Sequence, residues 1–352
     1  MVSYEGSNTG VTINLEDASG STTVQSAKGG HATGDILSGI EQVMGSDHSD
    51  VLAGSSLDNV LIGGKGNDRV SGLAGNDDLA GGDGNDTLNG GTGADRIWGD
   101  KGDDVITASS GRDTIYGGAG RDTYSFASSA ASVSIDLITN KHTGFAAETE
   151  IFEVENITAG SGNDTLRGTA KANTLDGGAG NDLFIATGAG DVLIGGAGTD
   201  TVSYQSVSAG ILVDFLNSAN NTGVAAGDTY SGIEDLWGSA HSDTLRGNDI
   251  GNRIRGGDGN DHLEGRGGVD LLYGEVGNNT LGGGAGADNM NGGAGNDVYW
   301  IDDKNDIIIE AANGGTDRIN STIPISLMLG TGPVRSTSSS TPRNPSRTFA
   351  AW

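Results

Sequence analysis

The sequence contains no cysteine, and only four of its 352 residues are proline. The absence of cysteine excludes disulfide bonds and thiolate metal sites. Aromatic residues make up 5% of the chain and no apolar run approaches the length of a membrane span, so neither a thick core nor a transmembrane helix is expected. Residues Met1–Glu5 have neither the basic nor the apolar region of a Sec-type signal peptide.

The sequence also lacks the motifs of several common catalytic sites. None of its five histidines lies in a His-Glu-x-x-His motif, no Gly-x-Ser-x-Gly occurs, and no glycine-rich turn continues into Gly-Lys-Ser/Thr. His48 and His241 occupy the same position of a longer repeat, which indicates duplication rather than a metal site. Carboxylates are too numerous for a glycosidase pair to be recognised. We therefore predict that the chain is not an enzyme.

Basic residues are scarce, because 19 lysines and arginines stand against 47 aspartates and glutamates, for a formal net charge of −28. This excess argues against nucleic acid and anionic membranes as partners. Self-repulsion of this size destabilises a compact chain unless cations neutralise it. The composition therefore predicts bound cations, and the 64 glycines predict many tight turns.

A nine-residue repeat organises most of the chain. Its rows read Gly-Gly-x-Gly-x-Asp-x-apolar-x, as in residues 63–71 and 177–185. Ten rows run from Ile36 to Ser125, six from Glu150 to Ser203 and eight from Thr229 to Trp300. Position eight is apolar in every row, and position six is Asp in most rows and Asn or Glu in the others.

The pattern of one row predicts its local structure. Positions seven to nine alternate polar, apolar and polar, which indicates a three-residue strand with one inward side chain. Positions one to six are rich in Gly, Asn and Asp, which suits a tight turn with positive φ. Two rows, or 18 residues, then complete one coil, so that each row stacks on the row two further along. We predict an all-β fold, a parallel β-roll (β-solenoid) whose position-eight residues form a thin interior ladder.

The same stacking brings the position-six carboxylates of successive coils close together. Bare carboxylates in such a ladder repel one another, and a hard divalent cation between the coils removes the conflict. Carboxylate and backbone carbonyl oxygens in a flexible turn fit Ca²⁺ better than Mg²⁺, which demands strict octahedral geometry. The sequence therefore predicts multiple Ca²⁺ ions, about a dozen at most.

These rows resemble the RTX, or haemolysin-type calcium-binding, nonapeptide repeats of bacterial type I secreted proteins. The resemblance covers all three blocks, and it implies that the first six residues of a row form the calcium-binding turn. The implied side-chain ligands are the position-six aspartates: Asp68, Asp77, Asp86, Asp95, Asp104, Asp113, Asp122, Asp164, Asp182, Asp191, Asp200, Asp243, Asp261, Asp270, Asp288 and Asp297. The implied carbonyl ligands are glycines at positions two and four: Gly64, Gly66, Gly82, Gly84, Gly91, Gly93, Gly118, Gly120, Gly178, Gly180, Gly196, Gly198, Gly257, Gly259, Gly284, Gly286, Gly293 and Gly295.

Some rows depart from the pattern, and we expect weaker sites there. Asn replaces the position-six Asp in four rows, at Asn59, Asn173, Asn252 and Asn279. Arg266 replaces a glycine in the row that contains Asp270. The longest regular run, from Gly63 to Asp122, is expected to hold the densest series of ions.

A longer period divides the chain into three cassettes. An alternating strand follows seven residues after each of Tyr4, Phe126 and Tyr204, and each strand leads through a small-residue loop into a block of rows. We predict cassettes at 1–125 (entry strand and loop 1–35, repeats 36–125), 126–203 (repeats 150–203) and 204–320 (repeats 229–300, flank 301–320). The entry strands are expected to cap the roll.

The two ends of the sequence each have two interpretations. Residues 2–4 align with residues 202–204 inside a row, so the chain is either a fragment of a longer protein or a short protein with a trimmed cap. The Ser/Thr/Pro/Arg-rich tail, 321–352, is expected to be disordered, either as a C-terminal secretion signal, which RTX proteins carry, or as a non-native end.

We predict a secreted calcium-binding repeat protein, structural or at the cell surface, whose folding is driven by Ca²⁺. The resemblance implies the type I export machinery as a partner. One alternative is the repeat region of a larger exported enzyme, such as a protease, lipase or alginate epimerase. Another is a module that binds cell-surface glycans through outward aromatic residues at position nine, which are Trp98, Tyr116, Trp237, Tyr273 and Trp300.

Overall fold

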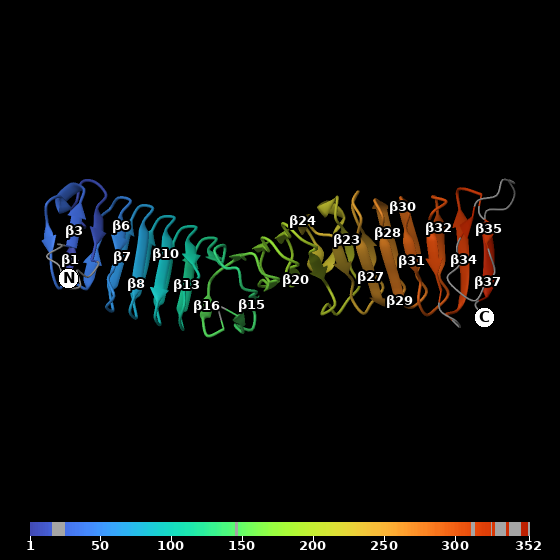
Figure 1. The fold of residues 1–352 in the computed structure, drawn as a ribbon, viewed down its shortest axis with the longest axis horizontal. Coiled ribbons are helices and arrows are strands. Elements are labelled where there is room, and N and C mark those ends of the chain that lie inside the picture. Colours follow the sequence, from blue (N-terminus) through green and yellow to red (C-terminus); the bar gives the residue numbers. More distant parts are fainter. Residues whose placement is uncertain are drawn as a thin grey trace. The chain divides into compact units, whose positions relative to one another are not determined.

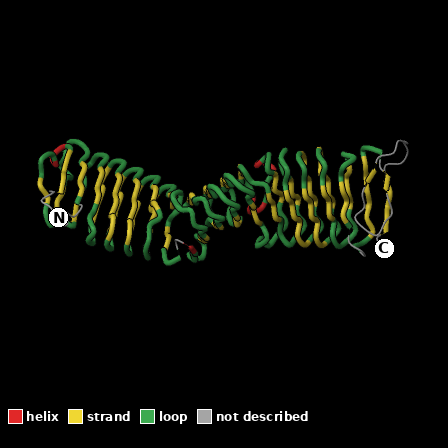
Figure 2. The backbone as a smooth tube through the Cα atoms, viewed as in Figure 1, coloured by secondary structure: helices red, strands yellow, loops and turns green. Residues whose placement is uncertain are grey.

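A computed structural model of the chain describes residues 1–15, 25–144, 147–310 and 314–324, together with the backbone of three short strands beyond them. It divides into two compact units, residues 1–169 with 173–178, and residues 170–172 with 179–352. Both units consist of short strands joined by turns, as Figure 2 shows, and the described residues contain no α-helix. Nearly all neighbouring strands pair in parallel. The predicted all-β, parallel β-roll is confirmed.

The first unit is built from two main sheets. One sheet has the parallel order β1 (Val2–Ser3), β5 (Gln42–Met44), β7 (Val60–Lys65), β9 (Asp78–Asp83), β11 (Arg96–Lys101), β13 (Thr114–Ala119) and β16 (Glu150–Phe152). The other contains β2 (Thr12–Asn14), β6 (Val51–Ala53), β8 (Arg69–Ala74), β10 (Thr87–Thr92), β12 (Val105–Thr107), β14 (Thr123–Ser125), β17 (Asn156–Thr158) and β19 (Thr174–Asp176). In Figure 1, β6, β8 and β10 lie side by side in this order.

The second unit repeats the arrangement. One of its sheets has the parallel order β20 (Leu183–Ile185), β22 (Thr201–Ser203), β25 (Asp235–Trp237), β27 (Arg253–Asp258), β29 (Leu271–Val276), β31 (Asn289–Asn291) and β33 (Ile307–Ile309). The other has β23 (Leu212–Asp214), β26 (Thr244–Arg246), β28 (His262–Gly267), β30 (Thr280–Ala285), β32 (Val298–Ile301) and β34 (Thr316–Ser321). A further pair joins β21 (Val192–Ile194) to β24 (Thr229–Ser231).

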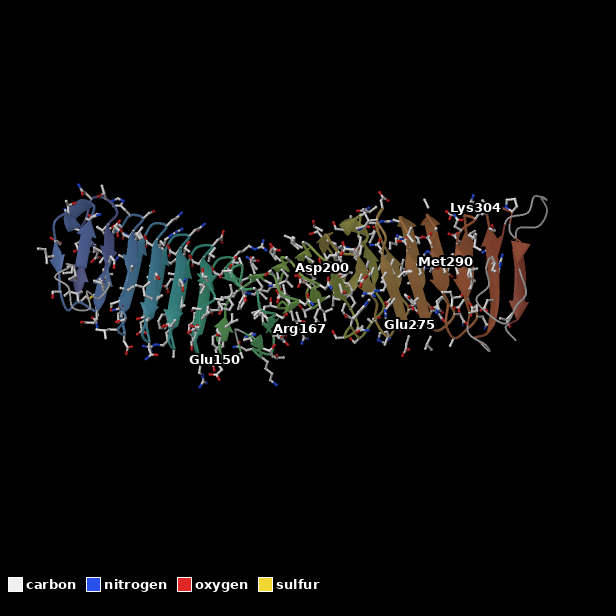
Figure 3. All side chains as sticks on the ribbon, in the orientation of Figure 1. Glu150, Arg167, Asp200, Glu275, Met290 and Lys304 are labelled. Carbon is white, nitrogen blue, oxygen red and sulfur yellow. The ribbon has the colours of Figure 1, made fainter. Side chains whose placement is uncertain are left out.

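The register confirms that two rows make one coil. Leu61 pairs with Leu79, and Leu88 pairs with Ile106, so each residue lies beside the residue 18 positions further along. Every position-eight residue of the 24 rows is at most 1% exposed, among them Leu61, Ile106 and Met290. Figure 3 labels Met290, in β31, and Glu275, near the end of β29, whose side chain is exposed. One apolar residue per row therefore suffices to build the core.

Each entry strand joins the roll beside the second row of its block. β2 pairs with β6, β15 (Ser134–Asp136) with β18 (Thr165–Arg167), and β23 with β26. The outer edge of β2 is covered by antiparallel β3 (Gln25–Lys28) and β4 (Ile36–Leu37). These positions agree with a capping role, because an unpaired sheet edge invites aggregation.

Ion pairs hold two of the entry strands. Arg167 Nη1 lies 3.1 Å from Asp136 Oδ2, and Arg266 Nη2 lies 2.8 Å from Asp214 Oδ2. The loops after the entry strands contain short 3₁₀ turns at Gly30–Ala32, Ser218–Asn220 and Gly223–Ala225. Arg266, which replaces a position-two glycine, thus docks a strand 52 residues away in the sequence.

The repeat continues past Trp300, where the sequence analysis ended it. β33 pairs with β31, Ile308 is buried at 3% exposure, and Asp306 occupies position six of this additional row. The signal was present in the sequence, because Asp306 and Ile308 follow Asp297 and Tyr299 by nine residues. The tail expected to be disordered lies largely outside the described residues. Within it, β35 (Ser326–Leu327) pairs with β36 (Ser336–Thr337), and β37 (Ser346–Ala350) pairs antiparallel to β34.

Candidate metal sites

The position-six side chains form hydrogen-bonded ladders along the first unit. The backbone N–H of each residue donates to the carboxylate Oδ1 of the aspartate one coil further along. The donor–acceptor distances are 2.7 Å for Asp68 to Asp86, 2.7 Å for Asp86 to Asp104 and 2.9 Å for Asp104 to Asp122. A second ladder has the same bonds from Asn59 through Asp77 and Asp95 to Asp113. The predicted proximity of position-six groups in successive coils is therefore present.

The second unit has the same ladders. One runs from Asn252 through Asp270 and Asp288 to Asp306, with distances of 2.7, 2.8 and 3.1 Å. The other runs from Asp243 through Asp261, Asn279 and Asp297 to Asp317. The backbone N–H of Asp182 donates to Asp200 Oδ1 over 2.8 Å, and the backbone N–H of Asp191 donates to Oδ1 of Asp228, in a loop, over 2.8 Å.

Two glutamates continue the ladders where an entry strand and loop interrupt the rows. Asp122 N–H donates to Glu155 Oε2 over 3.2 Å, and Asp200 N–H donates to Glu234 Oε2 over 2.9 Å. The partners are 33 and 34 residues apart instead of 18. The sequence analysis did not count these glutamates among the site residues, although their place at position six was visible.

Most of these aspartates use only one carboxylate oxygen in hydrogen bonds. The other, Oδ2, is buried without a hydrogen-bond partner among the described residues in a group that we call the open aspartates: Asp68, Asp77, Asp86, Asp95, Asp104, Asp122, Asp200, Asp261, Asp270, Asp288 and Asp297. These side chains are 0 to 3% exposed. A buried anion without a partner costs free energy, so each open aspartate marks a place where a cation would stabilise the fold.

A glycine backbone borders each open oxygen. A Cβ built on Gly63 would overlap Asp68 Oδ2 and would lie 2.5 Å from the carbonyl oxygen of Gly81, one coil further along. Gly72 and Gly81 have the same surroundings, with Asp77 and Asp86 in place of Asp68. The space that a side chain would fill at position one is therefore lined by a carboxylate oxygen and a carbonyl oxygen. This donor set fits Ca²⁺, which prefers carboxylate and carbonyl ligands.

The position-one carbonyls were not among the predicted ligands. The predicted glycines at positions two and four all have φ values in the left-handed region, for example 119° at Gly64 and 140° at Gly84. The carbonyl oxygen of Gly66 faces Gly84 so closely that any side chain there would overlap it. Glycine at position four is thus required by the close approach of successive turns, whichever carbonyls bind metal.

Burial raises the pKa of the open aspartates, with neighbouring carboxylates as a further cause. Desolvation, and then the charges of Asp86 and Asp50, raise the pKa of Asp68 to about 7, although the N–H of Asp50 opposes the shift. The pKa of Asp104 and that of Asp261 are also raised to about 7, mainly by desolvation. The protein without metal therefore disfavours the charged carboxylates at neutral pH.

Other position-six aspartates have both oxygens hydrogen-bonded, and we call them closed aspartates. Ser239 N–H donates to Asp243 Oδ2 over 2.6 Å, and the Ser239 hydroxyl donates to both carboxylate oxygens over 3.0 Å. Ser46 N–H donates to Asp50 Oδ2 and the Ser46 hydroxyl donates to Asp50 Oδ1, and the Ser109 hydroxyl donates to Asp113 Oδ2. In these three rows serine replaces the position-two glycine and supplies the donors. Asp164 is closed without serine, because the N–H of Val133 donates to Oδ1 and the N–H of Gly160 donates to Oδ2 over 3.3 Å.

Asparagine at position six makes its own contacts in all three blocks. Its Nδ2 donates to the carbonyl oxygen of the glutamate one coil earlier, over 3.5 Å from Asn59 to Glu41 and 3.1 Å from Asn252 to Glu234. The bond from Asn173 to Glu155 is 2.6 Å long. Asn279 Nδ2 instead donates to the carbonyl oxygens of Gly277 and Gly292, each over 3.2 Å. A neutral amide carries no charge for a cation to neutralise, and weaker sites in these rows stay a prediction.

The outward aromatic residues of the first unit stack on one another. The ring centroids of Trp98 and Tyr116 are 6.0 Å apart, those of Tyr116 and Phe152 are 5.1 Å apart, and the guanidinium of Arg96 lies over Trp98. In the second unit, Arg255 lies over the rings of Trp237 and Tyr273. Ring faces covered by neighbours are poor platforms for sugar stacking, so this geometry does not favour the glycan hypothesis.

Comparison with known proteins agrees with the geometry of the ladder. The family model of the RTX calcium-binding nonapeptide repeat (4 copies) matches residues 44–79, 53–88, 89–124, 158–189, 184–204, 246–281, 266–299 and 273–308. No curated protein matches the chain. Within the described residues, no helix has the length and apolar character needed to cross a membrane. Because its matches cover more than half of the sequence, the chain belongs to the RTX calcium-binding nonapeptide-repeat family.

Proposed function

We propose that this calcium-binding repeat protein is a folding switch, in which Ca²⁺ converts a loose chain into the β-roll. The observation that carries the proposal is the set of buried Oδ2 atoms of the open aspartates, which have no hydrogen-bond partner among the described residues. Without metal these carboxylates oppose the fold, and with metal they hold successive coils together. Metal binding and folding are then one equilibrium.

We further infer that the open aspartates are the side-chain ligands and that the closed aspartates are not. The Asp261 carboxylate offers a free Oδ2 to a cation, whereas Asp243 is saturated by Ser239 and the N–H of Ile211. A cation at Asp243 would have to displace these hydrogen bonds. Of the predicted ligands, Asp113, Asp164 and Asp243 are therefore assigned a structural role.

The switch suits a protein that acts outside the cell. Free Ca²⁺ is low in the cytosol and in the millimolar range outside, so a chain with weak, cooperative sites would stay loose before export and fold afterwards. A structural or surface role without catalysis is part of this proposal, and the repeat rows that the family model matches over more than half of the sequence support it. An extracellular location and export in an unfolded state, through type I machinery, are parts of this proposal.

Far-UV circular dichroism of the purified chain, titrated with Ca²⁺ from EGTA to 10 mM, tests the switch. We expect a cooperative transition from coil to β structure with Ca²⁺ and no transition with the same concentrations of Mg²⁺. A chain that is fully β-folded in EGTA would contradict the proposal, because the open aspartates would then be tolerated without metal.

A further inference from the structure

The last coil of the second unit differs from the regular coils at position one. In regular rows this position is glycine, as at Gly292, and the next coil places another glycine beside it. The residue 18 positions after Gly292 is Glu310, which directly follows β33. A carboxylate side chain thus stands where the regular coils have only backbone.

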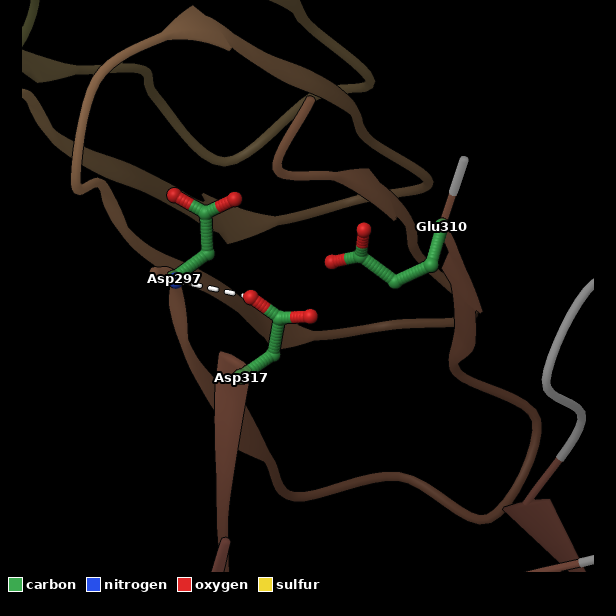
Figure 4. Close-up of side chains that lie close together, drawn as sticks. All are labelled: Asp297, Glu310 and Asp317. Carbon is green, nitrogen blue, oxygen red and sulfur yellow. Dashed lines mark hydrogen bonds between the residues drawn. The ribbon is translucent and has the colours of Figure 1, made fainter. Parts of the chain in front are cut away.

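Glu310 meets two position-six aspartates. Ligand oxygens of Asp297, Glu310 and Asp317 all lie within 4.8 Å of one another, and Figure 4 shows the Glu310 carboxylate pointing toward the other two. Asp297 is 1% exposed and Asp317 is 7% exposed. Asp297 N–H donates to Asp317 Oδ1 over 2.9 Å, which continues the ladder across a spacing of 20 residues instead of 18.

The open oxygen of Asp297 faces this cluster. Asp297 Oδ1 accepts the N–H of Asn279, while its buried Oδ2 has no hydrogen-bond partner among the described residues. A Cβ on Gly292 would overlap both Asp297 Oδ2 and the hydroxyl of Tyr299. That hydroxyl donates to Glu310 Oε1 and accepts the N–H of Gly292. Asp297 Oδ2 and the Glu310 carboxylate therefore border the same space.

We propose that Asp297, Glu310 and Asp317 form a terminal Ca²⁺ site, in which the Glu310 side chain replaces the position-one glycine carbonyl of the regular coils. The inference rests on the proposed function, since it takes the open aspartates as ligands. Oxygens bound to one Ca²⁺ ion lie at most about 5 Å apart, because each Ca–O distance is about 2.3–2.6 Å. The three carboxylates meet this limit without rearrangement.

The charges of the cluster also favour a divalent cation. Desolvation raises the pKa of Asp297, with the Asp317 charge as a further cause, and desolvation raises the pKa of Asp317. A divalent cation would offset the negative charge that these clustered carboxylates carry when they are ionised. A bound Ca²⁺ would tie Glu310 and Asp317 to the coil before them, so the site would stabilise this end of the roll.

Hydrogen–deuterium exchange of the full chain during a Ca²⁺ titration tests the site. Peptides from 298–310 and 314–321 report on the terminal coil, and peptides from 60–107 report on the regular ladder of the first unit. Glu310→Gln keeps an acceptor for Tyr299 but removes the charge. We expect it to raise the Ca²⁺ midpoint of the terminal peptides by at least about tenfold and to leave the regular peptides unchanged.

Two control variants separate ligation from other effects. Glu148→Gln removes the same charge at an exposed position of the first unit, and it is expected to leave the terminal midpoint unchanged. Tyr299→Phe removes the hydrogen bond to Glu310 but keeps all three carboxylates, so the midpoint should also stay. A Glu310→Gln midpoint equal to that of the wild type, or a Tyr299→Phe shift of the same size, overturns the inference.

The same titration distinguishes this inference from the proposed function. If the regular peptides of the wild type gain protection with Ca²⁺ while Glu310→Gln behaves like the wild type, the terminal site is refuted and the proposed folding switch is retained. If no wild-type peptide responds to Ca²⁺, both the folding switch and the terminal site are refuted.

Discussion

Acid should partly replace calcium in folding this protein. The open aspartates oppose the metal-free fold only when they are charged, because their carboxylates are buried. Burial raises the pKa of Asp68, Asp104, Asp261 and Asp270 from 3.8 to about 7. The folded state therefore binds more protons than the unfolded state between about pH 4 and pH 7, and its stability falls as the pH rises through this range.

The size of the effect follows from the shifts. A carboxylate whose pKa rises from 3.8 to about 7 destabilises the folded state by about 4 kcal/mol at pH 7.5. At pH 5 the same group is protonated in the folded state, and about 2 to 3 kcal/mol of this cost disappears. Two such groups account for about 5 kcal/mol, which equals the total stability of a weakly stable domain. Acidification alone should therefore shift the folding equilibrium strongly.

The assay is far-UV circular dichroism in calcium-depleted buffer, with the pH lowered from 7.5 to 5.0. We expect the β signal to increase as the pH falls and to disappear again when the pH is raised. The lower limit stays above the sequence pI of about 4.2, and sedimentation velocity checks that the chain remains monomeric and unaggregated. A β signal that is independent of pH, or that is higher at pH 7.5 than at pH 5.0, would refute the reasoning.

Two further predictions compare matched substitutions. Asp261→Asn, at an open aspartate, should raise the Ca²⁺ midpoint of folding while leaving the metal-free chain as stable or more stable, because it removes a buried charge. Asp243→Asn, at a closed aspartate, should destabilise the chain by about 1–3 kcal/mol, since a donor from Ser239 loses its acceptor. Its Ca²⁺ midpoint should shift only as far as this loss of stability requires. Equal midpoint shifts in both variants would refute the distinction between open and closed aspartates. Gly84→Ala should lower the melting temperature in saturating Ca²⁺ by several degrees or more, because its φ is 140° and its Cβ would overlap a carbonyl of the preceding coil. Gly6→Ala, where nothing lies within 4 Å of the new Cβ, is the control, and a similar melting temperature for both would contradict the steric argument.

The nine-residue period was sufficient to predict the coil. An apolar residue at position eight of every row can be buried only if the chain reverses once per row, which places residue i beside residue i+18. The pairing of Leu61 with Leu79 and the burial of every position-eight side chain follow from this period. The same period continues through Asp306 and Ile308, and the sequence analysis ended it one row too early.

The division of the aspartates into open and closed groups depends on the tertiary structure. Asp243 and Asp261 are the same residue at the same repeat position, and they differ in the donors that surround them. Ser239 donates from its backbone and hydroxyl to Asp243, whereas the glycine turn around Asp261 leaves Oδ2 without a donor. Serine at position two accompanies the closed state at Asp243, but Asp164 is closed with Gly160 at that position, so the backbone orientation within the turn also decides which oxygen has a donor.

Contacts between distant segments also required the structure. The sequence places Asp214 and Arg266 in separate segments, and the docking of the entry strand brings them within 2.8 Å. Glu310 replaces the glycine that the pattern has at position one, and only the stacking of the last coil sets its carboxylate beside Asp297 and Asp317. The sequence by itself determined the repeating coil, because one apolar residue in every nine is buried when two rows make one coil and residue i lies beside residue i+18. The tertiary structure decided which carboxylates remain without a partner, because that depends on the donors that each coil brings to its neighbour.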